Sequence, residues 1–345
     1  MNKFLILLGS LFVLTFFSCN DDGKEDDLLD TLENEKSVIH EYLSQITTPI
    51  LYLEYYSVYG MLIDTVFIFN YDGSGEVAKD SGWALIDYEK YFLGEDKKID
   101  TTTPVLGDTI PTYAYGGPIL YHYDTVRKYD YIADALRHIS VGDMGGEMII
   151  PSILAGNEDR YGRPLHYKLK AHKLIDNVKK NEEELIQRYI SDILGSSDEE
   201  LDYPDSVQSD TVTHTVFLRR GTGDRTIQIG DSVLMVLANG LLDDVGVDNR
   251  EIRMIENDTV KILYNETWQK KYPSGMIKGF QRLREGDVAS IVVPYGMAYG
   301  AAGTTGNTFV NMEGKSVKQY LIPPYSTLWY NVEVWRVIPP KTEEE

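Results

Sequence analysis

Apolar residues recur at helical spacing in two separate segments of the chain, residues 34–46 and residues 181–193. The residues that share one face of the second segment are Leu185, Ile186, Tyr189, Ile190 and Ile193. This spacing is typical of an amphipathic helix that packs on another part of the protein. Asn181 is placed to cap the helix, because Glu184 follows three residues later and the pair can satisfy N–H groups of the first turn.

After each helical segment the sequence alternates between apolar and polar residues, and Gly, Pro, Asp and Asn divide it into short pieces. This pattern predicts strands joined by turns. A brief helical stretch is expected just before Gly142 and again just before Gly286. Each half is therefore predicted to be an antiparallel sheet with one short helix, which is an α+β fold.

The two halves repeat these patterns in the same order. Residues 34–46 and 181–193 share Asn, Glu, Ile, Tyr, Ser and Ile at matching positions. The further matches, in order, are Val66-Phe67 with Val216-Phe217, Gly73-x-Gly75 with Gly221-x-Gly223, residues 84–88 with 233–237, Gly142-Asp143 with Gly286-Asp287, Ile150-Pro151 with Val293-Pro294, and Leu165-x-Tyr167 with Leu328-x-Tyr330. Such colinearity indicates two copies of one folding unit.

The longest apolar run lies near the N-terminus, at residues 4–17, between Lys3 and Ser18. It is too short to span a membrane comfortably. A buried helix is the alternative, but the run stops just before the only cysteine of the chain, Cys19, and an acidic stretch follows.

The layout of this run resembles a bacterial lipoprotein signal, in which residues 1–18 are removed and Cys19 carries the lipid. Lipidation also accounts for a single cysteine in an exported protein. Residues 19–33 would then form an acidic, flexible tether. The mature protein is expected at the outer membrane, facing the periplasm or the cell surface.

Charge and motif content exclude several classes of function. The chain has 33 Lys and Arg against 54 Asp and Glu, a formal net charge of −21, so we expect no nucleic acid on a basic face. The six histidines are scattered without metal-ligand spacing, and neither a metal nor a cofactor is expected. The glycine-rich segments lack the Lys-Ser/Thr of a phosphate loop.

Three motifs of the C-terminal half occur in the order found in one known family. They are Met276-Ile277-Lys278-Gly279-Phe280, then Gly286-Asp287 through Val293-Pro294 to Ala298-Tyr299-Gly300, and then Leu321-Ile322-Pro323-Pro324 through Thr327-Leu328 to Tyr330. With them this half resembles the FKBP-type peptidyl-prolyl cis-trans isomerases. The resemblance implies a half-barrel sheet wrapped on a short helix, with an apolar hollow between them for a proline ring.

The resemblance also assigns residues to this hollow. The implied catalytic residues are Asp248, Ile277, Phe280, Tyr299, Ile322 and Tyr330, and the implied substrate-binding rim is Val247 and Met276. Phe280 would form the floor, while the N–H of Ile277 and the hydroxyl of Tyr299 would donate hydrogen bonds to substrate carbonyls. Ala238 stands where the family usually has a pocket tyrosine. The alternative for each apolar residue is an ordinary place in the core.

Such a hollow needs no nucleophile, metal or general acid. Rotation about an X–Pro bond faces a barrier of about 18–20 kcal/mol because resonance keeps the amide planar. A site that binds the twisted amide better than either planar form lowers this barrier. A dry aromatic floor helps by removing water that stabilises the planar amide.

The N-terminal half departs further from the family pattern. Gly156 stands at the position of Tyr299, and Arg163-Pro164 replaces the Ile-Pro-Pro motif. Asp100 keeps the Asp-Ser/Thr step of the family. We therefore expect this half to have the same fold without isomerase activity.

The sequence thus predicts two tandem FKBP-like units on a lipid anchor. The predicted segments are 34–178 for the degenerate unit, 179–204 for a linking helix and acidic loop, 205–338 for the isomerase-like unit and 339–345 for a tail. An insertion at residues 303–320 borders the predicted hollow. One hypothesis is a prolyl isomerase acting on proline-containing segments of exported proteins. The other is a noncatalytic scaffold subunit of an outer-membrane complex.

Overall fold

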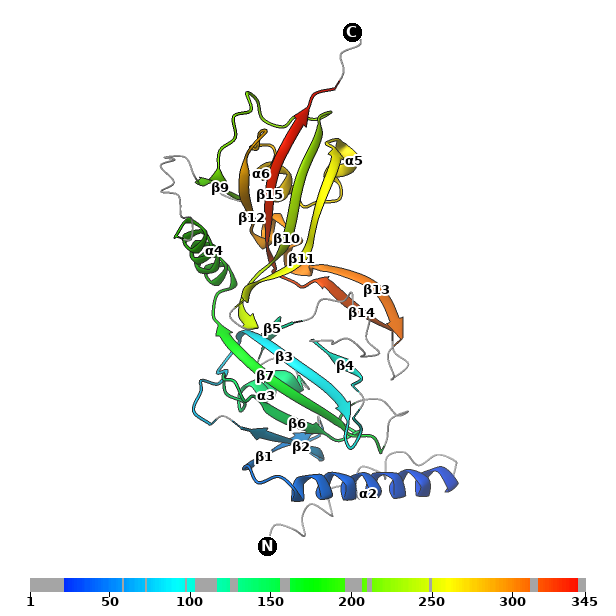
Figure 1. Ribbon diagram of the computed structural model, residues 1–345. Helices are drawn as coiled ribbons and strands as arrows, with labels where there is room; N and C mark the ends of the chain where they lie inside the picture. Colours follow the sequence, from blue (N-terminus) through cyan, green and yellow to red (C-terminus); the bar gives the residue numbers. More distant parts are fainter. Residues whose placement is uncertain are drawn as a thin grey trace. The chain divides into compact units, whose positions relative to one another are not determined.

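The computed structural model divides into two compact units (Figure 1). Unit 1 comprises Met1–Asp176 with Asn307–Lys318, and unit 2 comprises Asn177–Gly306 with Gln319–Glu345. The structure describes residues 22–57, 59–71, 73–96, 98–102, 117–124, 130–155, 162–195, 207–209, 213–247, 250–310 and 316–340. Within these segments no helix is long and apolar enough to cross a membrane. The predicted signal segment and Cys19 lie outside the described residues.

Unit 1 consists of a long helix and an antiparallel sheet. Its elements are α2 (Asp22–Ser44), β1 (Ile50–Tyr56), β2 (Leu62–Asn70), β3 (Gly82–Phe92), β4 (Asp100–Thr101), β5 (Ile119–Tyr123), α3 (Tyr131–Leu136), β6 (Gly146–Ile150) and β7 (Leu165–Ile175). The strands follow the order β1-β2-β6-β7-β3-β4, and β5 also pairs with β3.

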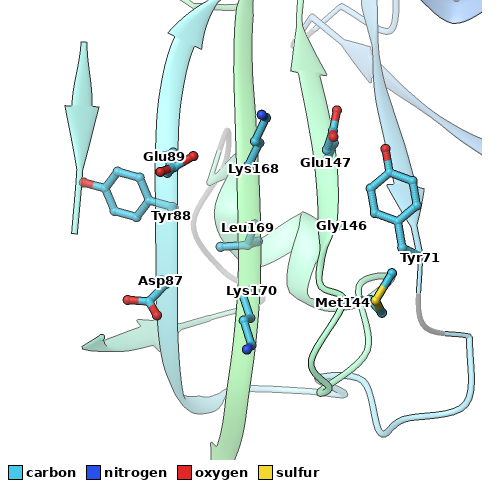
Figure 2. A pocket seen from close by; sticks show the side chains of 10 residues that line it. All are labelled: Tyr71, Asp87, Tyr88, Glu89, Met144, Gly146, Glu147, Lys168, Leu169 and Lys170. Atoms are coloured by element: carbon cyan, nitrogen blue, oxygen red, sulfur yellow. The ribbon is translucent and has the colours of Figure 1, made fainter. Parts of the chain in front are cut away.

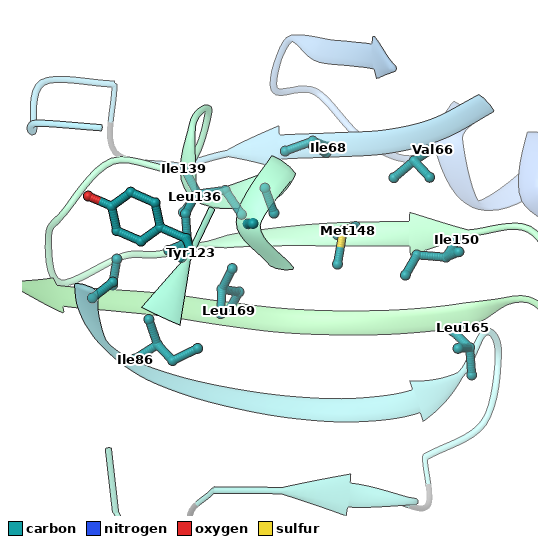
Figure 3. Close-up of a cluster of buried hydrophobic side chains, with 14 of the residues drawn as sticks. Val66, Ile68, Ile86, Tyr123, Leu136, Ile139, Met148, Ile150, Leu165 and Leu169 are labelled. Carbon is teal, nitrogen blue, oxygen red and sulfur yellow. The ribbon is translucent and has the colours of Figure 1, made fainter. Parts of the chain in front are cut away.

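The two faces of the unit 1 sheet differ because successive side chains point to opposite sides. The outer face carries charged residues on β3, β6 and β7, and a hollow of about 260 Å³ lies there (Figure 2). The helix α2 packs on another part of this face, where Ile39 lies in a cluster with Ile149. The inner face carries the core, in which Ile86, Met148 and Leu169 pack against α3 (Figure 3).

Unit 2 has a second set of elements of the same kinds. They are α4 (Val178–Gly195), β8 (Val207–Ser209), β9 (His214–Arg219), β10 (Ser232–Val247), β11 (Arg250–Leu263), α5 (Glu266–Gln269), α6 (Ser274–Phe280), β12 (Val288–Val293), η3 (Tyr295–Met297), η4 (Gly300–Ala302) and β15 (Thr327–Ile338). Two further strands, β13 (Thr304–Val310) and β14 (Ser316–Ile322), belong partly to unit 1, which includes Asn307–Lys318. The sheet of unit 2 follows the order β8-β9-β12-β15-β10-β11. The insertion predicted at residues 303–320 contains β13 and most of β14, which pair in a separate two-stranded sheet.

The strand orders show that the two units share one topology. Strands β1, β2, β6, β7, β3 and β4 occupy the same places as β8, β9, β12, β15, β10 and β11. The pairing of residues between strands agrees with this shared topology. Glu147 pairs with Lys168 in unit 1, and the residues at the corresponding positions of unit 2, Ser290 and Asn331, also pair with each other. The short helices α3 and α6 lie in the predicted places. The α+β class and the tandem repeat are therefore confirmed.

Equivalent glutamates hold the first helix of each unit. Glu35 of α2 accepts a hydrogen bond from the N–H of Ser152 at 2.6 Å. Glu182 of α4 accepts one from the N–H of Tyr295, also at 2.6 Å. Ser152 and Tyr295 each follow the proline that ends a central strand. Both carboxylates therefore satisfy a backbone donor at the same point of the repeat.

Equivalent tyrosines make a second contact between helix and sheet. The hydroxyl of Tyr42 donates to Glu147 at 2.6 Å, and the hydroxyl of Tyr189 lies 3.1 Å from that of Ser290. The apolar face of α4 completes this contact with a buried cluster: Leu185, Ile186, Ile190, Val216, Leu242, Val292 and Trp329. The helix predicted as a link is therefore packed on the outer face of the unit 2 sheet.

Both long helices begin earlier than the sequence predicted. The helix α2 begins at Asp22, so most of the tether expected at residues 19–33 is helical instead. Leu28, Leu29 and Leu32 of this helix are half-buried, which continues the apolar periodicity.

The helix α4 begins at Val178 because Asn177 caps it. The side chain of Asn177 accepts a hydrogen bond from the N–H of Lys180 at 3.1 Å. Asn181, predicted as the cap, donates its N–H to the carbonyl of Asn177 at 3.0 Å and is already inside the helix. The predicted cap was wrong by one turn.

Candidate functional site

The inner face of unit 2 is covered by α6, which lies close against β12. Two glycines make this approach possible: a Cβ added to Gly275 would lie 2.4 Å from Val293, and one added to Gly279 would lie 2.3 Å from Ile291. The helix therefore directs Phe280, at its C-terminal end, into the core, where its exposure is 0%.

Phe280 lies in a group of aromatic rings. Its ring centroid is 5.3 Å from that of Tyr264 and 4.9 Å from that of Trp268. Trp268 lies 4.7 Å from Tyr272, whose ring meets Tyr330 edge-on at 6.1 Å. The structure thus brings the predicted residues Phe280 and Tyr330 into one aromatic cluster, bridged by two rings between them.

The bridging rings come from a segment to which the sequence analysis gave no role. The one-turn helix α5 carries Trp268, and Asn265 caps it by accepting a hydrogen bond from the N–H of Trp268 at 2.9 Å. The available signal was the spacing of Tyr264, Trp268 and Tyr272, which are four residues apart. Aromatic residues at that spacing share one side of a helical segment.

Two predicted positions on α6 have other roles in the structure. Met276 was expected at the rim, but its exposure is 0% because it faces the core side of the helix. The N–H of Ile277 was expected to meet a substrate carbonyl, but it donates to the carbonyl of Pro273 at 3.3 Å as part of the helix. This helix begins at Ser274, so the amide of Ile277 lies within its first turn.

Tyr299 lies in a loop and Ile322 ends β14 just before a second loop, and the two loops are joined through their backbones. Tyr299 precedes η4, and the N–H of Tyr325 donates to the carbonyl of Gly300 at 3.0 Å. Gly303 has a φ of 63°, and a Cβ there would lie 2.3 Å from the carbonyl oxygen of Ile322. A glycine is therefore required where these loops meet.

Tyr299 is half-buried, and burial raises the pKa of its phenol. Its hydroxyl therefore stays protonated and able to donate at neutral pH. Within the described part of the chain this hydroxyl has no hydrogen-bond partner. The geometry leaves it available to a ligand.

Ala238, at the position where the family usually has a pocket tyrosine, does not share a face with Tyr330. Asn239 pairs directly with Tyr330 and shares its face, whereas Ala238 pairs with Asn331 and packs with the α4 cluster on the outer face. β10 alternates regularly here, because its pairing with β15 runs without a shift through Ala238, Asn239 and Gly240; the irregularity between Asn239 and Gly240 is an extra residue in β11.

The remaining predicted residues lie where side chains are not described. Val247 ends β10, and the structure gives its backbone only. Asp248 and Gly156 lie outside the described residues. Their assignments stay predictions. Across the described segments no group of three His, Cys, Asp or Glu side chains could hold a metal ion.

Unit 1 has a different set of residues on the same inner face. Leu136 of α3 occupies the place of Phe280 and is likewise 0% exposed. Tyr88 donates to Asp100 at 3.0 Å, and its ring lies 5.9 Å from that of Tyr167. The aspartate singled out in the sequence is thus held by a tyrosine.

The solved structures that the chain matches share little sequence with it. FkpA from Escherichia coli is 19% identical with a TM-score of 0.30, covering 48% of this chain and 64% of its own. A peptidyl-prolyl cis-trans isomerase from Pseudomonas syringae is 18% identical with a TM-score of 0.29, covering 45% and 95%. The three FKBP domains of wheat FKBP73 are 12% identical with a TM-score of 0.28, covering 79% and 95%. No curated protein gives a significant sequence match.

The family model for FKBP-type peptidyl-prolyl cis-trans isomerases matches residues 223–335. This range contains α6, the aromatic cluster and the loops of Tyr299 and Ile322. The C-terminal unit is therefore similar to the FKBP-type peptidyl-prolyl cis-trans isomerase family over residues 223–335.

Proposed function

We propose that unit 2 binds proline-containing segments of exported proteins and accelerates the rotation of their X–Pro bonds. The observation that carries this proposal is the aromatic cluster of Phe280, Trp268, Tyr272 and Tyr330 beneath the family's sheet and helix. Flat apolar rings are suited to hold a pyrrolidine ring in a dry environment.

Isomerisation requires only that the site bind the twisted amide more tightly than the planar forms. Water stabilises the planar, charge-separated amide, so an apolar surface lowers the barrier by excluding it. The hydroxyl of Tyr299 donates to a peptide carbonyl and positions the chain. The amide of Ile277 is used inside α6, so substrate positioning depends more on Tyr299.

We place this activity at the bacterial envelope. The apolar run at residues 4–17, the single Cys19 and the acidic stretch after it support a lipid-anchored, exported protein. Two or more acyl chains on Cys19 would hold it stably, because each buried methylene contributes about 0.8 kcal/mol. Metabolic labelling with an azido fatty acid, compared between wild type and Cys19→Ala, tests the anchor.

The test of the proposed function is a protease-coupled isomerase assay on the isolated mature chain with an Ala-Phe-Pro-type peptide. We expect a rate above the thermal one that falls in Tyr299→Phe. Trp335→Ala is the matched control, because Trp335 is an aromatic residue of the same unit that is 48% exposed and outside the cluster. A wild-type rate equal to the thermal rate contradicts isomerase activity.

A second candidate is a noncatalytic scaffold subunit of an envelope complex. The observation that favours it is the complete burial of Phe280 beneath the protein's own Trp268 and Tyr264 rings. A peptide would have to use the outer part of the cluster or displace a ring. A thermal rate in that assay, together with binding of the same peptide in a separate titration, supports this candidate.

A further inference from the structure

The outer face of the unit 1 sheet carries the hollow of about 260 Å³. Figure 2 shows Lys168 and Lys170 on β7, with Asp87 and Glu89 on β3 to one side and Glu147 on β6 to the other. The volume is below the roughly 300–1,000 Å³ of sites for drug-sized molecules. The hollow therefore has room for a ligand of about one small ring.

The charges in this hollow are not required by the fold. Strand pairing places Asp87, Glu89, Glu147, Lys168 and Lys170 of unit 1 at the positions of Val236, Ala238, Ser290, Asn331 and Glu333 of unit 2. Unit 2 forms the same strand order with a single ionisable residue in this set. The polar lining of unit 1 is therefore specific to that unit.

The carboxylates of the hollow are held mainly by neighbouring residues, and Tyr71 of the hollow also donates a hydrogen bond to Glu147. Asp87 lies 2.6 Å from His172 Nε2. Glu147 lies 2.7 Å from His166 Nε2 and accepts from Tyr42 at 2.6 Å. A carboxylate has about four acceptor sites, so each keeps acceptor capacity while its position is held. Groups held in this way lose little freedom when a ligand binds.

The two lysines supply donors next to these acceptors. Lys168 Nζ lies 5.3 Å from the ring centre of Tyr91, and Lys170 Nζ lies 3.6 Å from Asp143, whose side chain is fully exposed. An ammonium group has three donors, so both can also reach a ligand. Three carboxylates and two ammonium groups nearly cancel, so the lining favours neither a strong anion nor a strong cation.

An apolar wall completes the hollow. Tyr71 and Met144 lie on the side away from β3 (Figure 2) and are 36% and 70% exposed. An aromatic face packs well against the C–H groups of a small ring. The site thus combines fixed acceptors, mobile donors and one apolar surface.

We propose that this hollow binds an uncharged, polyhydroxylated ring, a saccharide unit of hexose size. Every hydroxyl of such a ring both donates and accepts, which matches alternating carboxylate and ammonium groups. One side of the ring is apolar and suits Tyr71. This site is independent of the isomerase function proposed for unit 2.

The test is ligand-observed saturation-transfer NMR on the mature full chain with a panel of methyl hexosides. Inorganic phosphate and glutamate serve as charged probes, and each is added to test whether it displaces the bound hexoside. We expect saturable binding of at least one hexoside. Tyr71→Ala should weaken it roughly tenfold, as loss of a central aromatic contact does, and Lys170→Gln should weaken it as well.

The matched control is Tyr52→Ala, because Tyr52 is a 58% exposed tyrosine of the same sheet outside the hollow. The Tyr52→Ala variant should bind the hexoside with the same affinity as wild type. Three outcomes overturn the proposal: no hexoside gives saturable binding, phosphate or glutamate displaces the sugar as a tighter ligand, or both Tyr71→Ala and Lys170→Gln bind the sugar like wild type.

Discussion

The backbone N–H of Tyr295 donates a hydrogen bond of 2.6 Å to the carboxylate of Glu182, which joins the loop after β12 to the helix α4. The same carboxylate oxygen accepts the hydroxyl of Thr327 at 2.6 Å, at the start of β15. These two segments lead directly to Tyr299 and Tyr330. Glu182 therefore supports the candidate site from the opposite side of the sheet.

We expect Glu182→Gln to change how the stability of unit 2 depends on pH. Burial raises the pKa of Glu182, and the hydrogen bonds from Thr327 and Tyr295 only partly oppose this. Since the folded-state pKa lies above the unfolded value of roughly 4.3, the stabilisation from protonated Glu182 is complete below that pH and is lost as pH rises through the folded pKa. The amide of the variant does not titrate.

Urea unfolding near pH 4 and near pH 7, followed by tryptophan fluorescence, measures this difference. Trp268 and Trp329 are buried in unit 2 and report on it. Wild type should lose stability relative to Glu182→Gln as pH rises. Equal pH profiles for the two proteins would contradict the raised pKa.

Glu147 of unit 1 should show the opposite pH dependence. Burial acts to raise its pKa, but hydrogen bonds from His166 and Tyr42 outweigh burial and lower the pKa to about 2. The resulting stabilisation is present above the unfolded value of roughly 4.3 and is lost as pH falls toward 2. It amounts to at most roughly 3 kcal/mol, at about 1.4 kcal/mol for each pKa unit.

Acid unfolding followed by circular dichroism compares wild type with Glu147→Gln. The variant should be less stable at neutral pH and should approach wild type near pH 2. Glu41→Gln is the control, since Glu41 is an exposed acidic residue of α2. A stability difference that stays constant from pH 7 to pH 2 would rule out this linkage.

Phe280→Ala should destabilise unit 2 strongly. The ring is fully buried between Tyr264 and Trp268, and removal of a buried aromatic side chain costs about 3–5 kcal/mol. The midpoint of urea unfolding measures this loss. Trp335→Ala, which alters an exposed ring, should stay within about 0.5 kcal/mol of wild type. A similar small effect for Phe280→Ala would mean that the cluster does not stabilise the unit.

The features that the sequence predicted are those that depend on local pattern. Repeated motifs place the short helix α6 correctly, because apolar spacing and glycines act over a few residues. The contact of Trp268 with Phe280 could not be predicted, since it joins a one-turn helix to another element. The outer-face position of Ala238 could not be predicted, since it depends on which residues of β15 pair with β10.

Tyr299→Phe separates positioning from stability at the candidate site. The change removes one hydroxyl, and within the described residues that hydroxyl bonds to no other group, so the free energy of unfolding should change by less than about 0.5 kcal/mol. If Tyr299 donates to a peptide carbonyl, kcat/KM should fall roughly 2–10-fold, as expected for the loss of one hydrogen bond of about 0.5–1.5 kcal/mol. Tyr325→Phe is the control, because Tyr325 lies in the neighbouring loop with its ring 5.2 Å from Tyr295. An equal loss of activity in both variants, or a loss of stability in Tyr299→Phe, would show that the hydroxyl has a structural role and does not bind the peptide.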